Sequence, residues 1–139
     1  MNEESNEKQL PELLMIHPYL KDDPVNKQGE IGIITAAILN TDEFYVGFDD
    51  FEVGLYSADA LLTFKDSGAI YDFMHKHALT LSVDHFRDLK NIALLLDYGT
   101  LPQQRTAMEI VQKNPGLIAA ALVTLEESLG LDQAYKRGR

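Results

Sequence analysis

The sequence has no cysteine. It therefore offers no disulfide framework, no thiol nucleophile and no thiolate metal ligand. This absence is typical of a reducing compartment, and the polar, acidic residues 1–8 do not resemble a secretory signal. The longest apolar run, at 117–123, is too short to span a bilayer. We therefore expect a cytoplasmic protein that does not enter a membrane.

Basic residues are scarce in the first half of the chain. The 139 residues hold 22 Asp and Glu against 12 Lys and Arg, which gives a net charge of −10. Residues 1–66 carry 14 acidic and 4 basic side chains, whereas residues 67–139 carry 8 of each. Because an acidic module repels phosphate backbones, we do not expect nucleic acid as a partner. The charge favours solubility, or attraction to a basic protein.

The segment 29–56 is rich in β-branched and aromatic residues and is interrupted by polar turns. This pattern predicts three antiparallel strands, at 29–39, 43–48 and 51–56. Glycines 32, 47 and 54 fall inside these strands. Glycine inside a strand marks a bulge, a sharp bend or a close backbone approach.

The flanks of this segment are less regular. Two prolines exclude a helix interior over 17–24. The apolar segment 10–16 fits either a short helix or a strand. Ser57 is placed to cap one helical turn before a closing strand at 62–64.

After Lys65 the apolar spacing becomes helical and predicts four helices. Their N-caps are assigned to Asp66 or Ser67, to Thr80 or Ser82, to Thr100 with Gln103, and to Asn114 before Pro115. Gly99 and Gly130 are placed to end the second and fourth helices. The fourth helix carries an apolar stripe over 117–125, most of which we expect in the core. The remainder leaves room for a homodimer.

Three short motifs lie in the predicted strands. They are Gln-Gly-Glu-Ile-Gly-Ile-Ile at 28–34, Tyr-Val-Gly-Phe-Asp-Asp at 45–50 and Gly-Leu-Tyr at 54–56. Together they resemble the small SH3-like β-barrels, including KOW-type modules, over residues 24–64. The resemblance implies a module that binds proline-rich peptides, histone-like tails, RNA or other parts of its own protein. The chain departs from it in having no tryptophan, and in being acidic where ribosomal KOW modules are basic.

The sequence therefore predicts an α+β fold, in which an N-terminal antiparallel SH3-like small β-barrel precedes an antiparallel bundle of about four helices. The expected divisions are an N-terminal tail or short arm at 1–16, the β module at 17–65, and a helical domain at 66–139 packed on it.

A binding surface for a protein partner is predicted on the β module. Its candidate residues are Tyr45, Asp49, Asp50, Phe51 and Tyr56. Acidic turn residues would face solvent, and aromatic side chains could line a groove. Aromatic residues at alternate strand positions also pack in cores or as cross-strand pairs, so both interpretations stay open.

Three histidines are the candidates for a metal site: His75, His77 and His85. On a helix the first two point to different faces, whereas helical metal pairs are four residues apart. In an unwound segment they would share a face, and His85 with Asp84 or Asp88 could join them. Phosphate-binding loops and nucleophile elbows are absent from the sequence. We predict no metal, no cofactor and no catalytic residue.

Three functions follow from these observations. The favoured one is a non-enzymatic protein-interaction or assembly module that acts through an acidic β-barrel. The first alternative is a ribosome- or RNA-associated KOW-like factor, which the acidity disfavours. The second alternative is a weak metal-binding protein or enzyme that uses the three histidines.

Overall fold

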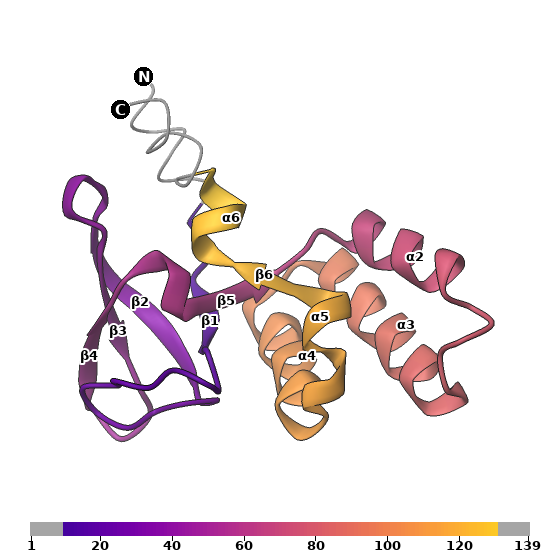
Figure 1. Cartoon of the computed structure of the whole chain (residues 1–139), viewed down its shortest axis with the longest axis horizontal. Coiled ribbons are helices and arrows are strands. Elements are labelled where there is room, and N and C mark those ends of the chain that lie inside the picture. The colour runs from indigo at the N-terminus through magenta and orange to yellow at the C-terminus, as the bar shows by residue number, and fades with distance from the viewer. Residues whose placement is uncertain (1–9, 131–139) are drawn as a thin grey trace. The chain divides into compact units, whose positions relative to one another are not determined.

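A computed structural model describes residues 10–130 of the chain (Figure 1). It confirms the predicted α+β class. The described chain divides into two compact units. The β unit comprises residues 10–63 and 124–130, and the helical unit comprises residues 64–123. Within residues 10–130, no helix combines the length and the apolar character needed to cross a membrane.

Six strands form one sheet in the order β4-β3-β2-β1-β5-β6. They are β1 (Leu13–Ile16), β2 (Ile31–Ile38), β3 (Glu43–Gly47), β4 (Val53–Tyr56), β5 (Leu61–Phe64) and β6 (Leu122–Thr124). The predicted strands at 29–39, 43–48 and 51–56 are confirmed as β2, β3 and β4. The segment 10–16, whose type the sequence leaves open, contains a strand. The strand order is that of an open sheet with β4 and β6 at its edges.

The core of the β unit follows from the alternation of side chains along its strands. In β3, Phe44 and Val46 are fully buried, and the register places them opposite Tyr56 and Gly54 of β4. The 3-10 helix η2 (Ala58–Ala60) and the short helix α6 (Leu125–Leu129) add to this core. Its buried members are Leu14, Ile16, Phe44, Val46, Tyr56, Ala58, Ala60, Leu61 and Leu125.

Two of the strand glycines lie where another side chain takes the space of a Cβ. A Cβ at Gly32 would stand 2.9 Å from Cε1 of Phe48 and closer still to a methyl group of Val46. A Cβ at Gly54 would stand 2.7 Å from the ring of Tyr56. Glycine is therefore needed at both positions because a side chain of the same sheet, and not chiefly another backbone, takes the space of a Cβ.

The helical unit contains three helices of ten or more residues. They are α2 (Ser67–Lys76), α3 (Val83–Tyr98) and α4 (Leu101–Lys113). Asp66, Ser82 and Thr100 cap them, each accepting a hydrogen bond from the backbone N–H three residues later. Gly99 ends α3 in the left-handed region, with φ of 77°. These predicted caps are confirmed.

The prediction of one fourth helix from 115 to 129 is wrong. The segment forms the 3-10 helix η3 (Pro115–Leu117), the short helix α5 (Ile118–Ala121), strand β6 and helix α6. Asn114 does not cap η3 with its side chain; its amide donates to Asp88 at 3.4 Å. The apolar stripe predicted over 117–125 does not form one helix because its residues are buried in two different cores. Ala121 is buried in the helical unit and Leu125 in the β unit.

The predicted cap at Ser57 is also wrong. The Ser57 side chain makes no capping hydrogen bond and instead donates to Asp59. The N–H of Ala58, at the start of η2, donates to Oδ1 of Asp42 at 2.9 Å. A carboxylate distant in sequence therefore takes the role that the local pattern assigned to Ser57.

Candidate binding site

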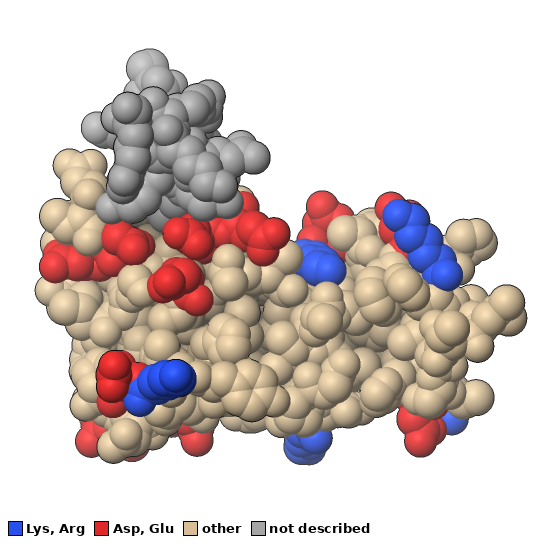
Figure 2. Space-filling model, viewed as in Figure 1, with Lys and Arg blue, Asp and Glu red and all other residues tan. Residues whose placement is uncertain are grey.

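Acidic side chains are concentrated on the β unit. Its described residues, 10–63 and 124–130, include 12 Asp and Glu but 2 Lys and Arg, whereas the helical unit has 6 of each. Figure 2 shows acidic side chains predominating over the strands and both signs mixed over the helices. The β unit therefore carries a negative potential that attracts cations and basic surfaces.

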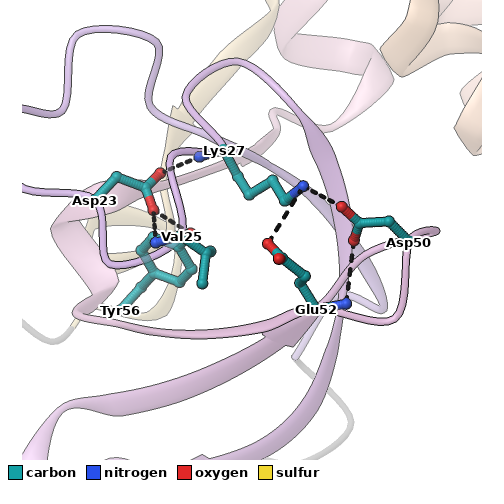
Figure 3. Close-up of polar contacts among 6 residues, drawn as sticks. All are labelled: Asp23, Val25, Lys27, Asp50, Glu52 and Tyr56. Carbon is teal, nitrogen blue, oxygen red and sulfur yellow. Dashed lines mark hydrogen bonds and ion pairs between the residues drawn. The ribbon is translucent and has the colours of Figure 1, made fainter.

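The long loop between β1 and β2, residues 17–30, is fixed to the β unit by Asp23 (Figure 3). The buried carboxylate of Asp23 accepts hydrogen bonds from the N–H of Val25 at 3.0 Å and the N–H of Lys27 at 2.9 Å. It also accepts one from the hydroxyl of Tyr56 at 2.8 Å. Three donors therefore replace the water that the carboxylate loses on burial.

A second contact joins the same loop to the turn between β3 and β4. The ammonium of Lys27 pairs with Asp50 and, at 3.6 Å, with Glu52, and it lies 5.6 Å from the centre of the Phe48 ring. The hydrogen bond to Asp50 raises the pKa of Lys27 and lowers the pKa of Asp50. Both carboxylates are half-exposed, so the surface contact contributes little to stability.

Tyr56 makes the stability of the fold sensitive to alkaline pH. Burial, and then the hydrogen bond to Asp23, raise the pKa of Tyr56 above its ordinary value of 10.0. The stabilisation is therefore complete below pH 10.0 and declines as the pH rises beyond that value. We expect the urea midpoint to fall between about pH 9 and about pH 11. Tyr56→Phe should show a smaller fall, and an equal fall in both proteins would contradict this origin.

A surface hollow of about 370 Å³ lies in the β unit between the start of the 17–30 loop and η2. We call it the loop hollow. It is lined by His17, Tyr19, Leu20, Lys21, Asp22, Asp59 and Ala60. Tyr19 is 79% exposed, and its ring lies 5.9 Å from that of His17. The lining of the hollow therefore includes one exposed aromatic residue and two acidic residues.

One backbone–backbone hydrogen bond and two between side chain and backbone hold the walls of the loop hollow in place. The N–H of His17 donates to the carbonyl of Ala60 at 2.9 Å, which joins the loop to η2. Gln28 donates to the carbonyl of Leu20 at 3.0 Å. Nδ1 of His17 accepts from the N–H of Tyr19 at 3.2 Å, which leaves Nε2 as the other polar atom of that ring. A pre-formed site loses less entropy when a ligand binds.

The predicted binding residues are divided between surface and core. Asp49, Asp50 and Phe51 lie exposed at the turn between β3 and β4, and Tyr45 is half-buried on β3. Tyr56 does not lie on the predicted binding surface, because it is 4% exposed and its hydroxyl donates to Asp23. The reason is the pleat of β4, which turns Tyr56 towards the core, so that a partner cannot stack on its ring.

The three candidate histidines lie in the helical unit, and each has different surroundings. His75 lines a hollow of about 390 Å³ with Tyr71, Asp72, Met74 and Phe86. The ring of His77 lies 4.3 Å from that of Phe73. The backbone N–H of His85 is bonded to the Ser82 cap. In residues 10–130 no group of three His, Cys, Asp or Glu side chains has the geometry to hold a metal ion.

The residues of the loop hollow are absent from the sequence-based site. They come from two segments about forty residues apart, 17–22 and 59–60, which the pairing of β1 with β5 brings together. A sequence signal exists only in part: an aromatic residue between two prolines in an acidic loop. A comparison with protein-family models, curated proteins and solved structures finds no match for this chain.

Proposed function

We propose that the chain is a non-enzymatic protein-interaction module whose acidic β unit binds a basic segment of another protein. The observation that carries this proposal is the loop hollow. It brings Tyr19, which is 79% exposed, and the acidic residues Asp22 and Asp59 to the lining of one hollow, on a unit with six times as many acidic as basic side chains.

The chemistry of the loop hollow suits an arginine side chain. A guanidinium is planar, so it stacks on an aromatic ring while its N–H groups donate to carboxylates. Tyr19 offers the ring, and Asp22 and Asp59 offer the acceptors. Lys21 also lines the hollow, so that Asp22, Asp59 and Lys21 together carry a net charge of about −1, which a single arginine neutralises.

We propose further that the β unit is an SH3-like module, as the sequence motifs suggest. The strand pairing supports this proposal. β1 pairs with both β2 and β5, so the first strand connects the β2–β3–β4 ribbon to the last strand of the unit. The turn η2 separates β4 from β5.

The test uses a fluorescein-labelled peptide that carries arginine in a Gly-Ser background. Its control contains citrulline, which has the shape of arginine without the charge. We expect the protein to bind the arginine peptide and to lose about two- to fivefold in affinity with Tyr19→Ala or Asp59→Asn, as expected for an exposed cation–π contact or an exposed charge pair. The readout is fluorescence anisotropy at low ionic strength.

A matched control for Tyr19 is Tyr98 of α3, which is 73% exposed in the helical unit. Tyr98→Ala should leave the affinity unchanged. Equal binding of the arginine and citrulline peptides would contradict the proposal. Tighter binding to single-stranded RNA than to the arginine peptide would favour the RNA-associated alternative.

A further inference from the structure

The side of the β2–β3–β4 ribbon that faces away from its core is apolar and exposed. The register aligns Ile33 with Gly47 and Val53 in one row, and Tyr45 with Leu55 in the next. Ile33 is 37%, Leu55 42% and Val53 53% exposed. We call Ile33, Tyr45, Val53 and Leu55 the outer face. Contiguous exposed apolar side chains of this kind mark interaction surfaces.

Phe51 stands beside the outer face, two residues before Val53, and has two unfavourable features. Its φ of 70° lies in the left-handed region, which costs a non-glycine residue of its size conformational energy. Its side chain is 94% exposed. The turn is closed by the N–H of Phe51 donating to the carbonyl of Phe48 at 2.9 Å, a role that glycine or asparagine performs without strain. The folding of the hairpin therefore does not account for phenylalanine at this position.

The surroundings of Phe51 select the chemistry of a partner. Asp49, Asp50 and Glu52 flank Phe51 on the turn, and Glu43 lies at the other end of β3. Lys27 pairs with two of these carboxylates and leaves the group net negative. A second copy docked face to face would oppose like charges, and an anionic membrane would be repelled in the same way. A surface rich in lysine and arginine is complementary.

We propose that the outer face and Phe51 form a docking surface for a protein whose exposed apolar surface is flanked by lysine or arginine. Phe51 is the anchor: it packs against the apolar part of the partner while the acidic turn meets the basic flank. This surface shares no residue with the loop hollow, so the inference does not rest on the proposed function.

The probe is an amphipathic helical peptide of leucine and lysine, with a control that contains glutamate in place of lysine. We expect the protein to bind the lysine peptide at least about tenfold more tightly than the control. Leu55→Lys should weaken this binding at least about tenfold, because it places a cation in the apolar face. Leu94→Lys makes the same change on the helical unit at a residue that is 45% exposed, and should leave the affinity unchanged.

Phe51→Gly tests whether Phe51 contacts the partner or only shapes the turn, and it leaves the charge of the protein unchanged. We expect it to weaken peptide binding at least about fivefold while the thermal midpoint rises, because glycine relieves the strained φ. A fall in both quantities, or unchanged affinity, would overturn the proposal. Binding to phosphatidylcholine vesicles in preference to the peptide would overturn it too, as would a dimer in sedimentation that Leu55→Lys dissociates. Loss of arginine-peptide binding alone would count only against the loop hollow.

Discussion

Asp23→Ala is expected to lower the free energy of unfolding by about 3 kcal/mol, since each hydrogen bond to a charged group contributes roughly 1.5–3 kcal/mol and the losses overlap. The substitution removes the acceptor of three donors at once. It leaves the hydroxyl of Tyr56 buried without its acceptor, which is the costly part of the change. Urea denaturation followed by far-UV circular dichroism measures the effect.

The neighbouring residue supplies the matched control. Asp22 is exposed, so Asp22→Ala should change the free energy of unfolding by less than about 0.5 kcal/mol. Asp23→Asn keeps one acceptor oxygen and should fall between the two. Similar losses for Asp22→Ala and Asp23→Ala would show that the 17–30 loop is not held by the Asp23 carboxylate.

Leu125→Ala is expected to cost about 2–5 kcal/mol, the usual range for a fully buried leucine in a core. Leu125 is 0% exposed and packs with Leu14, Phe44 and Leu61 of the β unit. The chain thus leaves the helical unit and returns to complete the first core. Hydrogen exchange should show the loss chiefly at amides of β2 and β3.

Leu129 and α3 provide the comparison. Leu129 is partly buried against the same core, so Leu129→Ala should cost less than Leu125→Ala. Amides of α3 should keep most of their protection in both variants, because its buried residues lie in the other unit. Equal loss of protection in α3 and β3 would contradict the assignment of Leu125 to the β unit.

Local signals in the sequence were sufficient where the contact they describe is itself local. The caps at Asp66, Ser82 and Thr100 join residues three apart, so their geometry follows from the residue type at the cap and from the helical turn. Strands β2 to β4 were predictable for a similar reason, since β-branched residues and polar turns alternate over a short range.

The prediction of a fourth helix failed because the helical spacing of apolar residues does not indicate in which core each of them is buried. Leu117 and Leu125 share a helical stripe in sequence but are buried in different units. A usable signal was present: Thr124 and Glu127 form a Thr-x-x-Glu capping pattern, and Oγ1 of Thr124 accepts from the N–H of Glu127 at 3.1 Å. Read as a cap, it marks the start of α6 and the end of the preceding segment.

The candidate sites were predictable only in part. Asp49 and Asp50 were identified because a turn between two strands must be exposed. Phe51 was assigned to the strand 51–56 as an aromatic candidate, whereas the structure places it in the turn before β4. Tyr45 and Tyr56 could not be told apart, since the face of each strand depends on pairing with its neighbour. The loop hollow depends on β1 meeting β5, a contact between residues that are more than forty positions apart. No short motif encodes such a contact.

We propose that the acidic β unit, and not the helical unit, binds a basic protein segment. Titration of the ¹⁵N-labelled full chain with the arginine peptide, followed by amide chemical shifts, tests it most directly. We expect chemical-shift changes at Tyr19 and Asp22 and along η2, with α3 and α4 unaffected. These changes should disappear as added salt screens the charges. Shifts confined to α2, α3 and α4, or shifts that persist at high salt, would contradict it.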